Sequence, residues 1–387
     1  MSESYFIPYA SPEIGEEEIA EVVDSLRSGW LTSGPKVNRF EQEFADFLGD
    51  GGVHAVAVNS ATAGLHLALE SLGVGPGDEV ITTTYTFTAT AEVIRYVGAE
   101  PVLVDIDPAT YCLSPEDVAR KITEKTRAVI AVHFGGLAAP MDEILHIARQ
   151  HRLHVIEDAA HAVSTTHQGR LVGTLDTDVA VFSFYANKPI TTGEGGMLVT
   201  RSEEIAQRAR VMRLHGINRD VFDRYSSKAP SWYYEVLAPG FKYNMTDIAA
   251  SIGIHQLRKL SQFNVRRQEI AEKYFQLLMD LPIVLPPKPK AGDVHSWHLF
   301  VLQLREDSPM TRDEFINALH ANGIGASVHY VPLHVHPFWR SRYALTDEMF
   351  PESQHLYERC VSIPLYSKLS DEAVGRIVST IRRLLGG

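Results

Sequence analysis

The stretch HAVAVNSATAGLHLALESLGVGPGDEVITT, residues 54–83, holds two short apolar segments with a helical pattern between them. The segments His54–Val58 and Glu79–Thr83 have the length and character of strands. Between them, apolar residues recur at helical spacing, at Leu65, Ala68, Leu69 and Leu72. A Pro-Gly-Asp turn at 76–78 precedes the second strand. This order indicates two parallel strands joined by a crossover helix.

The same alternation continues up to residue 158. We expect further strands at Pro101–Asp105, Ala128–Phe134 and His154–Glu157. We expect helices between them at Ala89–Val97, Ser114–Ile122 and Met141–His151. This pattern predicts an α/β fold with a mostly parallel central sheet and helices on both faces. Two later strands, Val179–Phe184 and Gly196–Thr200, have only a loop between them, which favours one antiparallel pair.

The C-terminal third of the chain predicts a second, smaller unit. Helical patterns at Thr246–Leu260 and Val265–Leu281 lead into a proline-rich stretch at 282–289. Beyond it we expect three strands and two helices, at His298–Leu304, Thr311–Asn322, Ala326–Tyr330, Val361–Pro364 and Asp371–Leu385. We therefore predict a large domain over residues 1–260, which includes an N-terminal segment, and a small C-terminal α/β domain over residues 261–387.

Composition narrows the class of protein. The 387 residues carry a formal net charge of -12, which argues against a nucleic-acid surface because such a surface needs a basic face. The two cysteines, Cys112 and Cys360, are too few for a disulfide framework. The first residues have no signal-peptide pattern, and no apolar run approaches the ~20 residues of a membrane span. We expect a cytoplasmic protein without membrane association.

Polar side chains follow the predicted strands at the sheet edge where ligands bind in parallel α/β folds. Ser60 and Thr62 open a helix, so their hydroxyls and amides either bind a phosphate or cap the helix. Phe87 either stacks on a flat ligand or joins the core. Asp158 directly follows a strand and either holds a protonated ring nitrogen or caps a helix.

Lys188 stands in the stretch SFYANKPITTGEGGM, residues 183–197, between a strand and a Gly-rich loop. A shielded lysine has a lowered pKa and becomes a nucleophile that bonds aldehydes, whereas a lysine beside glycines alone is more often solvated. A phosphate site, a stacking aromatic, an acid for a ring nitrogen and an amine for an aldehyde are together the four contacts of pyridoxal phosphate. This conjunction favours a pyridoxal-phosphate enzyme.

Other chemistries lack their signatures. Among the 17 histidines, His295 and His298 lie three residues apart, and His334 and His336 two apart, without a cysteine or carboxylate cluster beside them. We therefore expect no metal. The chain contains no GxxxxGK[ST] stretch and no GxGxxG after a strand, which disfavours nucleotide-fold enzymes, NAD-dependent oxidoreductases included.

These residues resemble the DegT/DnrJ/EryC1/StrS aminotransferases, the sugar aminotransferases among the fold-type I pyridoxal phosphate enzymes. The resemblance covers nearly the whole chain. The matching segments are Ser28–Pro35, Ser60–Gly64, Glu157–Ala162, Phe182–Phe184, Lys188, Thr191–Gly196, Gly240–Met245, His329–Tyr330 and Pro332–His334. Their number and order make the resemblance specific, and it implies the family's fold, with a large cofactor-binding domain and a smaller C-terminal one.

The resemblance also implies residue roles. Lys188 is the catalytic residue, which bonds pyridoxal 5′-phosphate and moves the substrate proton. The remaining cofactor contacts are Thr62, Ala63, Phe87, Asp158, His161, Ser183 and Asn244, the last from the second subunit of a homodimer with shared active sites. The expected substrate-binding residues are Trp30, Thr32, Tyr185, Arg219, His329 and Tyr330. The implied reaction moves an amino group from L-glutamate, leaving 2-oxoglutarate, to a keto group of a nucleotide-linked sugar used for cell-surface glycans or lipopolysaccharide.

Within the family, three stretches are similar to the members that aminate C4 of a UDP-linked 4-keto sugar: GWLTSGPK, RDxxDR at 219–224 and VLAPGxKYN at 236–244. Those members carry Trp at the position of Phe87 and Asn at that of Pro189, whereas Asn187-Lys188 is similar to the perosamine-type C4 aminotransferases. C4 amination is thus the expected reaction. The alternatives are C3 amination and the family's sugar dehydratases, whose histidine in place of Lys188 argues against them. A non-catalytic binding protein would lack the lysine or the aspartate.

Overall fold

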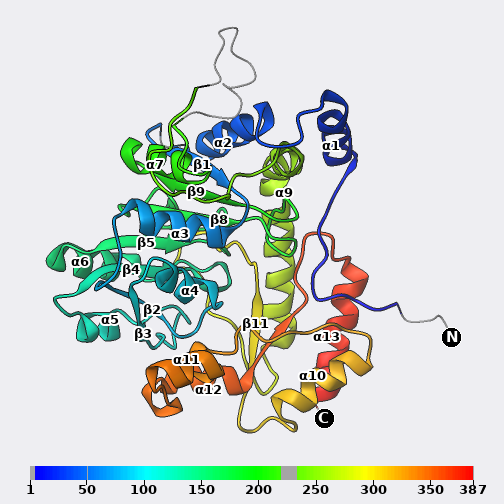
Figure 1. Ribbon diagram of the computed structural model, residues 1–387. Coiled ribbons are helices and arrows are strands. Elements are labelled where there is room, and N and C mark those ends of the chain that lie inside the picture. The colour runs from blue at the N-terminus through cyan, green and yellow to red at the C-terminus, as the bar shows by residue number, and fades with distance from the viewer. Residues whose placement is uncertain (1–4, 50, 219–232, 387) are drawn as a thin grey trace.

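A seven-stranded sheet forms the centre of the computed structural model, which describes residues 5–49, 51–218 and 233–386 (Figure 1). Across the sheet the strands are β1 (His54–Val58), β9 (Gly196–Thr200), β8 (Val179–Ser183), β5 (His154–Asp158), β4 (Thr126–Val132), β2 (Glu79–Thr83) and β3 (Glu100–Val104). β9 runs antiparallel to both of its neighbours, and every other neighbouring pair is parallel. The predicted mostly parallel sheet and its antiparallel pair are confirmed.

Helices cover both faces of the sheet (Figure 1). One face packs on α3 (Ala61–Ser71), α4 (Ala89–Tyr96) and α7 (Glu203–Met212). The other packs on α2 (Pro35–Leu48), α5 (Pro115–Lys121), α6 (Met141–His151) and the first half of α9 (Asp247–Leu278). Because both faces are covered, the central strands are almost wholly buried, as their continuous apolar runs predict.

The C-terminal unit is a three-stranded antiparallel sheet, β10 (Ile283–Val284), β11 (Phe300–Leu304) and β12 (Cys360–Ile363). It packs on the second half of α9, on α10 (Arg312–Ala321) and on α13 (Asp371–Leu385). Leu299, just before β11, and Val301, within it, join the core of the main sheet. The smaller elements are α1 (Glu16–Ser28), α11 (Pro337–Tyr343), α12 (Pro351–Arg359), β6 (Thr166–His167) and β7 (Arg170–Leu171).

Two predicted elements differ from the structure. The helices expected at Thr246–Leu260 and Val265–Leu281 are one helix, α9, because buried side chains such as Leu260 and Phe263 continue its apolar face across the expected break. The strand expected at Ala326–Tyr330 is wrong. Only Ser327 bridges to β12, through Ser362, and the chain then leaves the sheet. The boundary expected after residue 260 falls inside α9, and the division into two domains stays a prediction.

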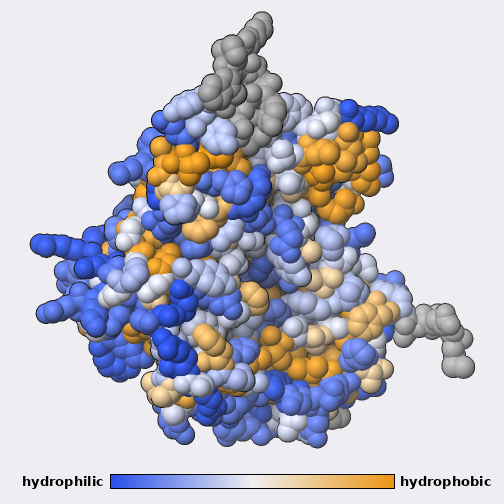
Figure 2. Space-filling model, in the orientation of Figure 1, coloured by the Kyte–Doolittle hydropathy of each residue, from blue (hydrophilic) through white to orange (hydrophobic). Residues whose placement is uncertain are grey.

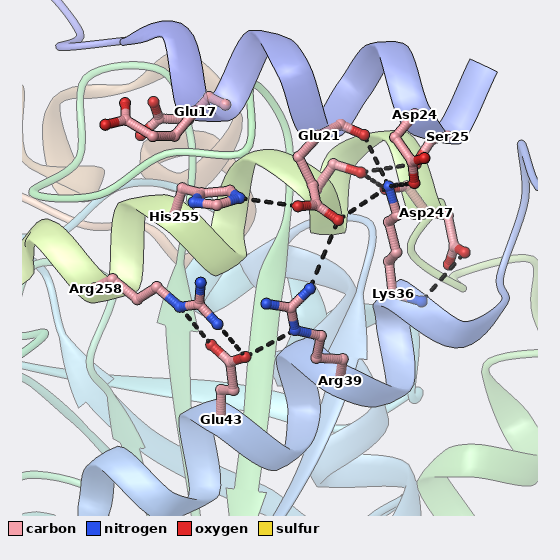
Figure 3. A network of polar contacts seen from close by, with 12 residues as sticks. Glu17, Glu21, Asp24, Ser25, Lys36, Arg39, Glu43, Asp247, His255 and Arg258 are labelled. Atoms are coloured by element: carbon pink, nitrogen blue, oxygen red, sulfur yellow. Dashed lines mark hydrogen bonds and ion pairs between the residues drawn. The ribbon is translucent and has the colours of Figure 1, made fainter. Parts of the chain in front are cut away.

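A buried carboxylate fixes the chain at the junction of α1, α2 and α9 (Figure 3). Asp247 is fully buried at the start of α9, and burial raises its pKa. Its Oδ1 accepts hydrogen bonds from the amide of Gly34, the N-cap of α2, at 2.8 Å and from that of Val37, in the first turn of α2, at 3.0 Å. Around it, partly exposed ion pairs such as Lys36–Glu21 contribute at most about 1 kcal/mol each, so the buried cap is the stronger constraint.

None of the helices in the described ranges has the length and apolarity that crossing a membrane requires.

Candidate active site

A cavity of about 490 Å³ lies at the carboxyl ends of β2, β5 and β8. Nine of the residues expected to act in the site line it: Thr62, Phe87, Asp158, His161, Ser183, Tyr185, Lys188, His329 and Tyr330. Because the carboxyl ends of parallel strands meet at one sheet edge, residues more than a hundred positions apart converge here. The location is the one that the strand-end argument predicts.

The N-terminus of α3 forms one wall of the cavity. Ser60 caps the helix, since its Oγ accepts a hydrogen bond from the Ala63 amide at 3.1 Å. The amides of Ala61 and Thr62 lie in the first turn, where an α-helix supplies no acceptor, and both residues line the cavity. A phosphate at this point would accept from these amides and gain from the helix dipole.

Gly196, the first residue of β9, passes directly behind this turn. A Cβ on Gly196 would lie 2.7 Å from the Ala61 nitrogen and 2.8 Å from the Ser60 carbonyl carbon. Both neighbours are backbone atoms, which cannot rotate away as a side chain can. The missing side chain is therefore what allows the helix N-terminus to lie against the sheet edge.

We expect Gly196→Ala to displace the turn, to lower the free energy of unfolding by about 1–3 kcal/mol and to weaken binding of pyridoxal phosphate about tenfold or more. Thermal unfolding and cofactor titration measure the two effects. Gly375→Ala is the matched control. A Cβ there meets nothing within 4 Å, on an exposed face of α13. That change should stabilise the protein by about 0.5–1 kcal/mol. Equal effects at the two positions would contradict the crowding argument.

Asp158 ends β5 with its side chain buried, 6% exposed, at the base of the cavity. Thr90 Oγ1 donates to its Oδ2 at 2.8 Å, and the Ala160 amide donates to Oδ1 at 3.2 Å. Since the Thr90 hydroxyl donates to Asp158, the hydroxyl of Thr86, 2.9 Å away, donates to Thr90. Burial raises the pKa of Asp158, while these hydrogen bonds and the Lys188 charge oppose the shift. A carboxylate fixed in this way is suited to a cation inside the cavity.

Lys188 follows the end of β8, and its amine enters the same cavity. Burial lowers the pKa of the amine to about 8, and the charge of Asp158 acts in the opposite direction. Relative to a solvated lysine, the neutral nucleophilic form at pH 7 is therefore about 300-fold more populated. The alternative that Lys188 is a solvated surface residue is therefore wrong.

His161 and Tyr330 form a fixed pair above Asp158. His161 Nδ1 accepts from the Gly135 amide at 3.2 Å. Burial, with the nearby Lys188 and His329, lowers the pKa of His161 well below its usual range, so the ring is neutral. Its proton therefore resides on Nε2 and is donated to the Tyr330 hydroxyl at 2.8 Å. Burial raises the pKa of Tyr330, so the hydroxyl keeps its own proton for a ligand.

Two aromatic side chains stand open at the cavity rim. Phe87 is 59% exposed and Tyr185 is 48% exposed, although both line the cavity. Their neighbours Tyr85 and Phe184 are fully buried, so the sequence places one core aromatic and one open aromatic at each strand end. An exposed phenyl ring beside Asp158 offers a flat face to a planar ligand.

Four of the expected site residues that the structure describes do not line the cavity: Trp30, Thr32, Ala63 and Asn244. Asn244 donates to Ser33 Oγ at 2.8 Å and to Thr32 Oγ1 at 3.4 Å, beside the segment that holds Trp30. The amide of Ala63, expected to bind phosphate, is occupied by the Ser60 cap. Arg219 lies outside the described residues. The roles proposed for these residues stay predictions.

Sequence reasoning missed two neighbours of the expected residues. Thr90, which orients Asp158, lies in the first turn of α4, and only its position one turn after Phe87 could have suggested it. His298 lies 3.5 Å from the Lys188 amine, whereas the sequence presents it only as a possible metal ligand. Within the described ranges, His, Cys, Asp and Glu side chains form no group of three or more able to hold a metal ion.

An amine of lowered pKa, a buried carboxylate, an open phenyl ring and a helix N-terminus share one cavity, and pyridoxal phosphate has a matching group for each of them. The fold and site therefore define a pyridoxal-phosphate enzyme. Over residues 12–382 the sequence matches the model of the DegT/DnrJ/EryC1/StrS aminotransferase family, and the chain belongs to this family. The fold class, the family and the cofactor expected from the sequence are confirmed.

Proteins similar to this chain in sequence or structure include a polysaccharide biosynthesis protein and sugar aminotransferases. The spore coat polysaccharide biosynthesis protein SpsC of Bacillus subtilis is 47% identical over 386 residues, 99% of this chain and 98% of that protein. The putative sugar aminotransferase Spr1654 of Streptococcus pneumoniae, solved in pyridoxal and pyridoxamine phosphate forms, has a TM-score of 0.91 at 33% identity over 98% of both chains. Helicobacter pylori PseC, an aminotransferase of pseudoaminic acid biosynthesis, has a TM-score of 0.89 at 27% identity over 98% of this chain and 99% of that one.

Proposed function

We propose that this protein transfers the amino group of L-glutamate to the C4 keto group of a nucleotide-linked sugar. The observation that carries the proposal is the convergence of Lys188 and Asp158 in one cavity beside the open ring of Phe87. The stretches shared with C4 aminotransferases favour that carbon, and UDP-4-amino-4-deoxy-L-arabinose is the product that we propose on this ground. The description of SpsC supports a role in cell-surface polysaccharide, and lipopolysaccharide is the alternative destination.

Each cavity residue has a role that follows from its chemistry. When bound, pyridoxal phosphate supplies an aldehyde that bonds amines and a ring that accepts electrons. The amides of Ala61 and Thr62, with Ser183, would hold its phosphate, Asp158 its ring nitrogen and Phe87 its ring face. Lys188 Nζ, whose lowered pKa leaves about a tenth of it neutral at pH 7, takes the proton from the α-carbon of the amino donor. The Tyr330 hydroxyl, which accepts a hydrogen bond from neutral His161, offers its own proton to an oxygen atom of a bound ligand.

A homodimer with shared active sites is part of the proposal. Among the described residues that line the cavity, Lys188 is the only lysine or arginine, yet the ligands carry phosphate and carboxylate groups. Thr32 and Asn244 contact each other outside the cavity of their own chain, where a second copy could approach them. Figure 2 shows an apolar patch over α1, where Ile19 is 48% and Leu26 54% exposed, a surface suited to burial in an interface.

We place the enzyme in the cytoplasm, because both cysteines are free and buried, as is usual in a reducing compartment. C3 amination by the same residues is the second candidate for the reaction. Loss of a sugar hydroxyl without amination is a third, and it conflicts with a lysine at position 188.

The test is a panel of nucleotide-linked 3-keto and 4-keto sugars incubated with ¹⁵N-glutamate. Mass spectrometry detects the labelled amine, and NMR assigns the carbon that carries it. We expect ¹⁵N at C4 and equimolar 2-oxoglutarate. Label at C3 would replace the C4 assignment, and a dehydrated unlabelled product would overturn the aminotransfer proposal. No product and no 2-oxoglutarate from any sugar would overturn it as well.

A further inference from the structure

His298 is the buried neighbour of the Lys188 amine. It stands two residues before β11, is 4% exposed, and presents Nε2 to Lys188 Nζ at 3.5 Å, the long end of hydrogen-bond distance. The segment that carries His298 comes from the C-terminal unit, so the contact spans the junction between that unit and the main sheet.

The protonation of His298 follows from its surroundings. Burial and the nearby Lys188 lower its pKa well below the usual range, so the ring is neutral. A charged amine donates hydrogen bonds and accepts none, so the nitrogen that faces it must be without a proton. The ring proton is then on Nδ1, a buried atom that has no hydrogen-bond partner among the described residues. The ring thus leaves Nε2 free as an acceptor.

The two other histidines near Lys188 cannot take this role. His161 Nε2 carries the proton that it donates to Tyr330, and its ring centre lies 4.4 Å from that of His298. His329 directs Nδ1 at Ser362 Oγ, 2.9 Å away, and stacks on Tyr9. Of the three rings, only that of His298 directs a nitrogen at the Lys188 amine within hydrogen-bond distance.

We propose that His298 is a positioning residue for Lys188: its Nε2 accepts a hydrogen bond from the amine and holds it inside the cavity whenever the amine is not bonded to the cofactor. The proposal rests on the catalytic role of Lys188 in the proposed function. After each release from the cofactor, such an amine must return to the same position. Without a hydrogen-bond acceptor to hold it, the lysine side chain would sample several rotamers.

The other titratable groups around the amine also influence its titration, so their charges must be known before a pH test. Two carboxylates, Asp158 and Glu194, line the cavity with the amine. His161, His329 and Tyr330 are uncharged at neutral pH. Burial lowers the pKa of Arg267, on α9 behind His298, to about 10, so this group stays charged up to that pH. An acceptor beside the amine stabilises the charged form, so removing it lowers the pKa of Lys188.

The experiment titrates Lys188 in the cofactor-free protein by trace acetylation between pH 6 and 10, with the modified peptide quantified by mass spectrometry. We expect the wild-type midpoint near pH 8. His298→Leu should lower it by about one unit, whereas His298→Gln, which returns an acceptor at the same reach, should keep it within about half a unit. His295→Leu is the control, because that buried ring stacks on Trp297 instead.

An unchanged midpoint in His298→Leu, or equal shifts in the Leu and Gln variants, would overturn the proposal. If the Leu variant does not fold, His298→Asn replaces it, since its shorter amide cannot reach the amine. The titration contains no cofactor or sugar, so failure of the sugar panel leaves its outcome intact. Conversely, a normal titration in His298→Leu would leave the aminotransferase proposal standing.

Discussion

Replacing Lys188 with alanine should lower amino transfer by at least about 10³-fold, the range that a positioned base contributes. The amine lies in the cavity with a pKa lowered to about 8 by burial, and among the described cavity residues it is the only lysine. The remaining contacts for the cofactor, from Asp158, Phe87 and the turn of α3, are untouched. We therefore expect cofactor that still binds but dialyses away, without the visible absorption that an attached lysine confers.

Steady-state turnover, dialysis and absorption spectra measure these effects. Methylamine should restore part of the turnover of Lys188→Ala, because a small amine can enter the space left by the side chain. Lys36→Ala is the control: this lysine pairs with Glu21 and Asp24 at the α1–α2 junction (Figure 3) and lies outside the cavity. Turnover of Lys188→Ala within tenfold of the wild type, in the absence of added amine, would contradict the assignment.

The sequence predicts the part of the site that strands carry. Asp158 ends β5 and Lys188 comes five residues after β8, and in a parallel sheet the end of a strand fixes where the next residues lie. The helix periods were equally clear, except in α9, where polar residues around position 262 suggested a break that the buried Phe263 bridges. Strand ends and apolar faces are local signals, so one sequence suffices to read them.

Contacts between distant segments were harder to predict. Thr90 reaches Asp158 across 68 positions and His298 reaches Lys188 across 110, and neither pairing leaves a local pattern in the chain. The strand expected at Ala326–Tyr330 failed for the same reason. In this segment the Tyr85 hydroxyl donates to the His329 carbonyl at 2.7 Å, so that carbonyl binds a distant side chain and no neighbouring strand. Tertiary hydrogen bonds of this kind override a local strand preference.

Replacing Asp158 with asparagine should have opposite effects on activity and on stability. The carboxylate would pair with the cationic ring nitrogen of the cofactor, and losing one partner of a buried pair costs about 3–5 kcal/mol, or about 10²–10⁴-fold in turnover. In the cofactor-free protein the same carboxylate lowers the stability of the fold. Burial raises its folded pKa, so ionised Asp158 destabilises the fold above that pKa and has no such effect below the unfolded value of 3.8. We therefore expect the cofactor-free Asn variant to match or exceed the wild type in thermal stability at pH 7, with the difference vanishing below about pH 4.

Turnover at saturating substrate and thermal unfolding of the cofactor-free protein at pH 4 and pH 7 test this pair of effects. Asp178→Asn is the matched control, because Asp178 binds His154 at 2.9 Å and the Val155 amide at 2.8 Å, at the opposite end of the same strands. That variant should lose stability and keep its turnover. If Asp158→Asn instead lost stability at pH 7 while retaining turnover, Asp158 would be a structural carboxylate. The buried Thr86–Thr90 hydroxyl chain would then serve the fold and not the cofactor.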